Sequence, residues 1–408
     1  MSNLALYRKY RPKTFDEISG QSAIVQTLRN QIRSGRIAHA YLFQGLRGSG
    51  KTSIARIFAK AVNCESTVDG NPCNQCEHCI TKNDVNPDLI EIDAASNNGV
   101  DNIRQLIDEV NYKPTNSKYK VYIIDEVHML SGSAFNALLK TIEEPPEHAI
   151  FILATTELNK VPPTIKSRCQ IFNFKSLVID EIKYTLKGIL SKEQINYFDD
   201  ECLEFIAKKA DGSMRDAVSI LDQCISCHET AVDVSSKPSL VSMEELRQLF
   251  GDVDNEVIQE LVECVKNSDI LKGIDILHKQ YHDGRNLKSI LNGMYEYYFN
   301  QYATGFNTDD GIVFERYSRI LGETMQTLDH SQQKLTVTEV AFIKLCKPEM
   351  EKDYNSVVQR MRNLEREIEL LKSGKTVSMP ENQVSQNIVD ENAIIYYNSM
   401  CNSIITIL

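Results

Sequence analysis

A glycine-rich loop at residues 45–52 is the first segment whose residue types and spacing suggest chemistry. It fits the pattern G-x4-G-K-T, and it lies between the apolar run Tyr41–Phe43 and a helical pattern that starts at Ser53. Glycines let backbone N–H groups close around phosphate oxygens, a lysine here reaches the β- and γ-phosphates, and a threonine binds Mg²⁺. The loop therefore predicts a nucleoside triphosphate site. Its candidate ligands are Gly45, Gly48, Ser49, Gly50, Lys51, Thr52 and Ser53.

Two adjacent acids supply what the other half of such a site needs. Asp125 and Glu126 follow directly on the apolar run Val121–Ile124, which reads as a buried strand. We expect Asp125 to hold Mg²⁺ through water and Glu126 to polarise the attacking water. The alternative is that the two acids only end a strand.

Four further residues could complete the site. Thr155 and Thr156 follow the apolar run Ile150–Ala154, and ligands bind at the carboxyl ends of parallel strands, so one hydroxyl is expected to sense the γ-phosphate or orient the water. A plain turn is the alternative. Arg168 is a candidate arginine finger, with a surface salt bridge as its alternative. Arg215 lies on a later helical segment and could reach the same nucleotide from a lid.

Four cysteines have the spacing C-x8-C-x2-C-x2-C, and we call residues 64–79 the cysteine module. The four are Cys64, Cys73, Cys76 and Cys79. Two overlapping C-x2-C steps suit tetrahedral coordination by thiolates, and four thiolates leave no open position on the metal. We therefore predict a structural zinc site. Unligated thiols and an iron–sulfur cluster are the alternatives.

A second cysteine pattern, Cys224–His228, matches the attachment motif of c-type haem. It continues a helical segment, so we expect Cys224 and Cys227 to be buried helical cysteines, with a redox pair as the alternative. The chain has eleven cysteines, an odd number, and no export signal at its start, which favours a reducing cytoplasm.

Size and charge limit the possible classes of protein. A chain of 408 residues usually forms about two to four domains. A net charge of −11 excludes a protein that coats DNA by bulk electrostatics, so contact with nucleic acid needs a local patch or a partner. No apolar stretch is long enough to span a membrane.

The apolar pattern indicates two kinds of architecture along the chain. Between Tyr41 and Phe174, strand-like runs alternate with helical patterns, which indicates βαβ units and a buried parallel sheet. After Leu177 the pattern is helical throughout. Residues 350–373 have the spacing of an amphipathic helix or of a short coiled-coil seam. The runs read as strands are Tyr41–Phe43, Leu89–Ile92, Val121–Ile124 and Ile150–Ala154.

Taken in order, these motifs resemble the AAA+ ATPases, and within them the gamma/tau subunits of the bacterial DNA polymerase III clamp loader. The resemblance runs from about Leu6 to Pro348. Many AAA+ proteins share one or two of the motifs, but the whole order with the cysteine insert is highly specific. Besides the motifs above, it rests on residues 7–12, 39–43, 88–96, 124–130, 136–146, 167–169 and 212–216.

The resemblance implies an α/β AAA+ core, which is a P-loop NTPase with a parallel sheet and a zinc-binding insert, followed by an all-α lid and an all-α collar. The collar would hold the subunits of an oligomer together. The implied boundaries are 1–178 for the core, with the cysteine module at 64–79, 179–241 for the lid and 242–349 for the collar. Beyond the resemblance, the residue pattern gives 350–373 for the amphipathic helix and 374–408 for a linker and an unassigned tail.

The resemblance also implies an activity. Such subunits form a five-subunit arc that hydrolyses ATP, opens a ring-shaped sliding clamp and places it on primed DNA. Arg11 and Pro12 would lie near adenine, Arg168 would serve the ATP of the neighbouring subunit, and Arg215 would serve its own. The implied partners are the delta and delta-prime subunits, further gamma/tau copies, the sliding clamp and primer–template DNA, without a membrane. The implied cofactors are ATP, Mg²⁺ and structural Zn²⁺.

In related subunits the helix that opens near Ser96 faces template phosphates. This chain offers Asn97 and Asn98 there, whose amides and nearby backbone N–H groups can bind phosphate, and Arg104 follows. Two other functions stay open: a non-hydrolysing scaffold subunit of the same assembly, and another AAA+ motor such as a branch-migration helicase. Beyond the single ATPase site we find no pair of metal-binding acids for a polymerase.

Overall fold

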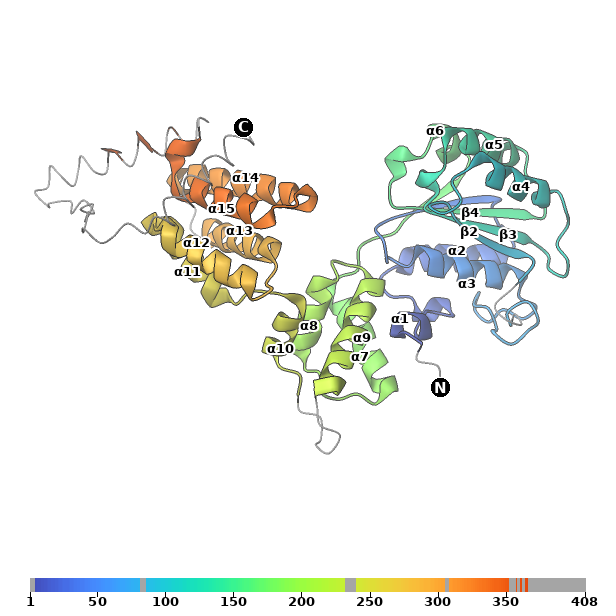
Figure 1. Ribbon diagram of the computed structural model, residues 1–408. Helices are drawn as coiled ribbons and strands as arrows, with labels where there is room; N and C mark the ends of the chain where they lie inside the picture. Colours follow the sequence, from blue (N-terminus) through green and yellow to red (C-terminus); the bar gives the residue numbers. More distant parts are fainter. Residues whose placement is uncertain are drawn as a thin grey trace, which may run out of the picture. The chain divides into compact units, whose positions relative to one another are not determined.

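A computed structural model of the protein describes residues 4–80, 86–231, 240–304 and 308–351, with five further positions between 357 and 365 (Figure 1). The chain forms two compact units, Met1–Leu249 and Phe250–Leu408, and each is described by itself. Across the described ranges, the helices are all too short or too polar to cross a bilayer.

The first unit is built on a parallel sheet of five strands in the order β2-β3-β4-β1-β5. Every residue of β4 is buried, and β3 is buried up to its last residue, as expected for a parallel sheet that is covered on both faces. The four predicted runs are strands, and β5 adds a fifth beside β1 that the sequence analysis did not name. The strands are β1 (Ala40–Gln44), β2 (Leu89–Asp93), β3 (Lys120–Asp125), β4 (Ala149–Thr155) and β5 (Gln170–Asn173).

Helices cover both faces of this sheet (Figure 1). Neighbouring residues of a strand point to opposite faces, so Tyr41 and Phe43 pack toward α2 and α3, whereas Leu42 packs toward α4 and α5. These two apolar clusters fix the layers of the core. The helices are α2 (Ser22–Ser34), α3 (Lys51–Asn63), α4 (Val100–Val110), α5 (Gly132–Glu143) and the short α6 (Pro163–Lys166); the 3₁₀ turns are η1 (Phe15–Glu17), η3 (Val127–Met129) and η4 (Leu158–Lys160).

A helical group follows the sheet, and the N-terminal helix α1 (Leu6–Lys9) belongs to it. The backbone N–H of Leu6 donates to Asp222 at 3.1 Å, and the Tyr10 hydroxyl donates to Glu193 at 2.5 Å. Residues from the start of the chain therefore pack on helices some two hundred residues later. The helices of this group are α7 (Ile179–Glu193), α8 (Asp200–Lys209) and α9 (Met214–Ala231), and α10 (Met243–Phe250) comes next.

The second unit is helical in the part of the chain described, as predicted. Its helices pack around one apolar cluster, and a buried arginine, Arg316, closes one end by donating to the carbonyl oxygens of Lys344 and Leu345. The helices are α11 (Asn255–Asn267), α12 (Ile270–His282), α13 (Leu287–Thr304), α14 (Thr308–His330) and α15 (Lys334–Cys346), followed by η5 (Pro348–Met350). The predicted amphipathic helix at 350–373 lies mostly outside the described residues, and 374–408 lies entirely outside them.

Candidate nucleotide and metal site

The glycine-rich loop connects the carboxyl end of β1 to the first turn of α3. Gly48 has φ +75°, and a Cβ atom there would lie 1.9 Å from the hydroxyl of Ser213. Gly45 approaches Phe174 so closely that a Cβ would lie 2.6 Å from its carbonyl oxygen. Larger residues would therefore separate the loop from the start of α9 and from the end of β5.

Lys51 lies inside the curve of this loop and is only 5% exposed. Its Nζ donates to the carbonyl oxygens of Gly45 at 2.8 Å and Leu46 at 2.9 Å. Burial lowers the pKa of the ammonium, and the carboxylates of Glu126 and Asp125 act in the opposite direction. The ammonium group is thus held where a bound phosphate chain would meet it.

The residues predicted to bind Mg²⁺ come from two different elements of the core, helix α3 and strand β3. Thr52 lies in the first turn of α3 and Asp125 ends β3, and the Thr52 hydroxyl donates to Asp125 Oδ2 at 2.6 Å. Hydroxyl and carboxylate oxygens are the ligands that Mg²⁺ prefers. The donor set therefore fits the predicted metal, and Thr52 and Asp125 are the residues that would hold it.

Glu126 is held in an unusual backbone conformation beside them, with φ +47° and ψ +45°. Non-glycine residues adopt this region rarely, and such strain tends to occur at functional sites. Its carboxylate accepts from the Thr156 hydroxyl at 3.2 Å, and His128 Nδ1 lies 3.4 Å away. The predicted acid is thus fixed by two neighbours rather than pointing freely into solvent.

The two threonines after β4 have different surroundings. Thr155 is fully buried, and its hydroxyl accepts from the backbone N–H of Glu157 at 3.0 Å, as in a turn. Thr156 is the one that contacts Glu126. Thr155 thus shapes the turn and Thr156 faces the acid, and the expected role of one hydroxyl toward the γ-phosphate or the water stays a prediction.

His128 is a site residue that the sequence analysis missed. Its side chain is 7% exposed, with Nδ1 at 3.1 Å from the Thr155 hydroxyl and Nε2 at 3.4 Å from Glu157. The histidine therefore joins Glu126 to the turn after β4. The available signal was its position within three residues of the acid pair.

Gln21 is a second residue that was missed. It is buried just before α2, and its side-chain amide donates to the carbonyl of Lys175 at 2.7 Å and more weakly to that of Ser49 at 3.5 Å. Its carbonyl accepts from the Lys175 backbone at 3.2 Å. Gln21 thus ties the glycine-rich loop to the end of β5, and a lone polar residue before a helix gave no sequence signal for this.

Two arginines reach the site from the N-terminal and helical segments. Arg215 lies in the first turn of α9 next to Gly48, and its guanidinium lies over the ring of Tyr7, 5.3 Å from the centroid. Burial lowers the pKa of Arg11, with Arg56, Glu91, Arg215 and Asp125 as its charged neighbours. Two of these neighbours, Arg215 and Asp125, are predicted site residues. The predicted contact of Arg11 and Pro12 with adenine stays a prediction.

Arg168 lies near the amino ends of the parallel strands, whereas the glycine-rich loop lies at their carboxyl ends. It precedes β5 and lines a surface hollow with His39, which precedes β1, whereas the loop follows β1. A five-residue strand spans about 16 Å, so Arg168 does not reach the phosphates of its own loop. Its guanidinium pairs with Glu143 at 2.8 Å and donates to the carbonyl of Thr164 at 2.9 Å. The salt-bridge alternative and a role toward another subunit are both compatible with this position.

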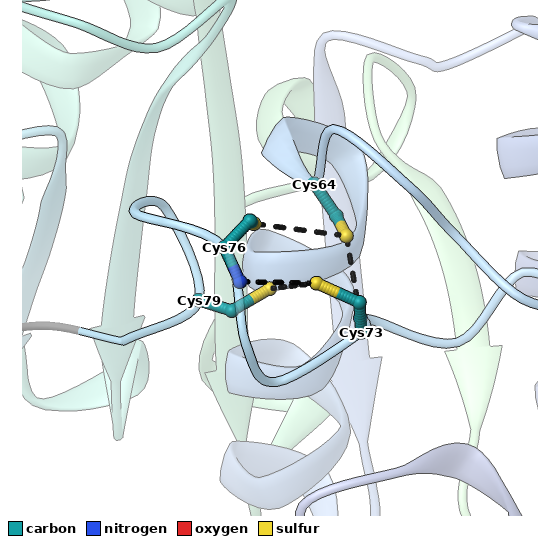
Figure 2. Close-up of side chains that lie close together, drawn as sticks. All are labelled: Cys64, Cys73, Cys76 and Cys79. Carbon is teal, nitrogen blue, oxygen red and sulfur yellow. Dashed lines mark hydrogen bonds between the residues drawn. The ribbon is translucent and has the colours of Figure 1, made fainter.

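The four cysteines of the module converge on one point (Figure 2). Their sulfur atoms all lie within 4.8 Å of one another, with 3.9 Å between Cys73 and Cys79 and 4.0 Å between Cys64 and Cys76. Zn–S bonds of about 2.3 Å in a tetrahedron place the sulfurs about 3.8 Å apart. The cluster therefore fits zinc.

Backbone groups favour the thiolate form in this cluster. The N–H groups of Gln75 and Cys76 donate to Cys73 Sγ at 3.4 and 3.2 Å and lower the pKa of Cys73 to about 6. Burial raises the pKa of Cys79, so a cation is needed to ionise the complete set. His78 instead contacts the Ser117 hydroxyl at 3.3 Å, which leaves the ligand set to the thiols.

The prediction for the second cysteine pattern is half wrong. Cys224 is buried in α9, but Cys227 is exposed. The buried stripe of this helix contains Leu221, Cys224, Ile225 and His228, and Cys227 lies at its edge.

The expected phosphate-facing helix begins later than predicted. α4 starts at Val100 rather than near Ser96, because residues 94–96 form a turn and residues 97–99 are irregular. The Asn97 amide donates to the carbonyl of Asp93 at 3.1 Å, and Arg104 lies 3.5 Å from Asp101. The side chains of Asn97 and Arg104 thus each contact a residue three or four positions away in the same segment.

Two family models and several relatives of known name match this chain. Residues 20–178 match a family described as "DNA polymerase III, delta subunit", and residues 181–229 match "DNA polymerase III clamp loader subunit, ATPase lid domain". DNA polymerase III subunit tau of Bacillus subtilis is 40% identical over 403 residues, covering 91% of this chain and 69% of that protein. Subunit gamma of Buchnera aphidicola subsp. Baizongia pistaciae is 43% identical over 265 residues, covering 64% of this chain and 71% of that protein.

Other relatives are longer or more distant. Subunit tau of Escherichia coli is 46% identical over 266 residues, which are 65% of this chain and only 40% of that protein. A solved structure of the Thermotoga maritima RuvB branch-migration motor has a TM-score of 0.45 at 19% identity, covering 63% of this chain and 80% of that one. That likeness is too low to carry an argument about function.

Proposed function

The chain belongs to the DNA polymerase III gamma/tau subunits, and we propose that it is an ATP-hydrolysing subunit of a clamp loader. Its core is an AAA+ ATPase, which binds a nucleotide with Mg²⁺. In this proposal the nucleotide is ATP, and its hydrolysis drives the opening of a ring-shaped sliding clamp and its placement on primed DNA.

One observation carries the hydrolytic role. Lys51, Thr52, Asp125 and Glu126 converge on a single site, where Thr52 contacts Asp125 directly and Asp125 and Glu126 both act on the charge of Lys51. A phosphoryl-transfer site needs these groups to bind phosphate, hold Mg²⁺ and activate water. A scaffold subunit that only occupied a place in the assembly would not need all of them.

The second half of the proposal concerns the assembly. Arg168 is too far from its own glycine-rich loop to act there, so we assign it to the nucleotide of a neighbouring subunit, where an arginine finger typically contributes about 10³ to 10⁵ in rate. The proposed neighbours are the delta and delta-prime subunits and further gamma/tau copies. Residues 179–241 would form the lid and 242–349 the collar through which subunits associate.

Zinc has a structural role in this proposal, because four thiolates close its coordination shell. The family name refers to a polymerase, yet we expect no nucleotide polymerisation by this chain alone. As a replication protein it would act in the bacterial cytoplasm, on the nucleoid. The lid match and the cysteine module favour this function over a branch-migration motor.

The decisive experiment is a clamp-loading assay with the purified chain, delta, delta-prime, the clamp and primed DNA. Clamp and primed DNA together should stimulate ATP hydrolysis, and clamps should appear on the DNA. Lys51→Ala should abolish both, because the buried ammonium that faces the phosphates is gone. Lys113→Ala is the control, since Lys113 is exposed. An unchanged hydrolysis rate in Lys51→Ala would contradict the proposal.

A further inference from the structure

The cysteine module and the phosphate site lie at the two ends of one helix. Lys51 and Thr52 are in the first turn of α3, and Cys64 caps its last turn. The thirteen residues of α3 span about 20 Å. The module therefore cannot take part in phosphate chemistry directly, and its effect on the site must pass through other residues.

Among the described residues, the buried polar contact of the module with the N-terminal segment is made by Asn71, and an exposed one joins Asn74 Nδ2 to the carbonyl of Lys13 at 3.3 Å. The Asn71 side chain is 8% exposed; its Oδ1 accepts from the backbone N–H of Phe15 at 2.8 Å, and its Nδ2 donates to Asp16 at 2.7 Å. Both halves of the amide are thus used. Arg29 on α2 reinforces the contact by pairing with Asp16 and, at 3.2 Å, with Asp69 of the module.

The segment held by Asn71 has both of its ends at the nucleotide site. At one end, Arg11 is influenced by the charges of Arg56 and Glu91 and, to a smaller extent, by those of Arg215 and Asp125 in the site. At the other end, Gln21 donates to the carbonyl of Lys175 at 2.7 Å and, more weakly, to that of Ser49 in the glycine-rich loop at 3.5 Å. The chain between residues 11 and 21 therefore runs from the nucleotide site to the cysteine module, which it contacts at Phe15, and back to the site.

We propose that the cysteine module positions residues 11–21 against the nucleotide site, with Asn71 as the positioning residue. The inference rests on the proposed nucleotide binding. Asn71 lies in the loop between Cys64 and Cys73, so a metal that fixes these two thiols also fixes the loop that carries Asn71. The module thus holds residues 11–21 in place beside the nucleotide site, in addition to any support it gives to local folding.

The test uses the full chain and the variant Asn71→Ala, with Glu77→Ala as the matched control. Glu77 is an exposed residue of the same module. Three quantities are measured: zinc per chain, hydrogen exchange of the amides at residues 15–18, and the Kd of a fluorescent ATP analogue. Asn71→Ala should keep its zinc, exchange these amides about tenfold faster and bind the analogue about tenfold more weakly, because a buried donor and a carboxylate lose their partner. Glu77→Ala should match the wild type in all three.

A second variant, Asp16→Asn, approaches the contact from outside the module. It keeps the size of the side chain and removes the charge that Asn71 and Arg29 share, so it should shift exchange and Kd in the same direction by a smaller factor. This variant decides the question if Asn71→Ala loses zinc or unfolds.

The outcomes separate this inference from the proposed function. Unchanged exchange in Asn71→Ala, or faster exchange with an unchanged Kd, would overturn the inference while the wild type still binds nucleotide. A wild-type chain that binds no ATP analogue would instead contradict the proposed function, and the exchange data would then show only whether Asn71 holds the segment.

Discussion

The Thr52 hydroxyl donates a hydrogen bond to Asp125 across 2.6 Å and so joins the first turn of α3 to the end of β3. The two residues belong to different crossovers of the sheet, and their contact depends on the correct order of strands. A metal ion at this point would bind to groups that the fold has already brought together.

We predict that Asp125→Asn removes most of the hydrolysis without unfolding the chain. The amide has the size of the carboxylate but lacks the charge that attracts Mg²⁺, so kcat should fall by about 100-fold or more, and half-maximal activity should need more Mg²⁺. Steady-state ATPase assays across a magnesium titration would measure both effects. Asp108→Asn, an exposed acid on α4, is the control. Wild-type activity in Asp125→Asn would remove Asp125 from the site.

We predict that His128 acts by positioning Glu126. Replacing it by alanine removes the group at 3.4 Å from Glu126 and at 3.1 Å from Thr155, so kcat should fall about tenfold while the KM for ATP changes little. His128→Gln, which keeps a polar group near Nδ1, should recover part of the loss. An equal rise in KM would instead indicate that the variant disturbs nucleotide binding.

The sequence predicted the parts of the site that lie within one local pattern. The glycine-rich loop, the acid pair and the cysteines each combine special residue types at short spacing. Gln21 and His128 were missed because their partners, Lys175 and Glu157, come from other elements of the fold. Strand β5 was missed because only two of its four residues are apolar, and its one buried residue lies between two exposed ones. Such contacts depend on tertiary packing, which a local pattern does not contain.

Arg168→Ala should separate nucleotide binding from hydrolysis. Because Arg168 lies at the amino ends of the strands and its own loop lies at their carboxyl ends, the isolated variant should bind ATP with wild-type affinity. In an assembled clamp loader, hydrolysis at the neighbouring site should fall by about 10³ or more. Binding is measured on the isolated chain and turnover in the complex. Arg36→Ala, an exposed arginine outside the site, is the control. Loss of ATP binding by the isolated variant would contradict a role toward the neighbour.

Removal of the metal should unfold the cysteine module. Structural zinc typically contributes on the order of 10 kcal/mol to local folding, so a strong chelator should expose residues 64–79 to protease. A variant with serine at all four cysteines should show the same cleavage without chelator. Limited proteolysis with mass spectrometry locates the cut, and metal analysis counts the zinc. A Cys227→Ser variant should keep its zinc, because Cys227 lies on α9. If the quadruple variant resisted protease, the four cysteines would not be needed to fold residues 64–79, and the module would be an ordinary loop.

The contact between Tyr10 and Glu193 should make the attachment of α1 sensitive to alkaline pH. Burial, and then the hydrogen bond to Glu193, raise the pKa of Tyr10 from 10.0 to about 12. The folded chain therefore keeps this proton at a pH where the unfolded chain has lost it. The stabilisation is complete below pH 10 and is lost as the pH rises through about 12. Lys9 and Tyr10 lower the pKa of Glu193, so its own contribution is lost only on acidification.

Tyr10→Phe keeps the ring and removes only the hydroxyl, so it isolates this contribution. At neutral pH it should lower the free energy of unfolding by about 0.5 to 1 kcal/mol, because the hydrogen bond is lost but the pair is partly exposed to water. The difference between variant and wild type should shrink between pH 10 and pH 12, since the wild type also loses the proton there. Urea unfolding at a series of pH values measures it, with the exposed Tyr184→Phe as the control. A difference that stays constant across this range would show that the hydroxyl stabilises α1 without its proton.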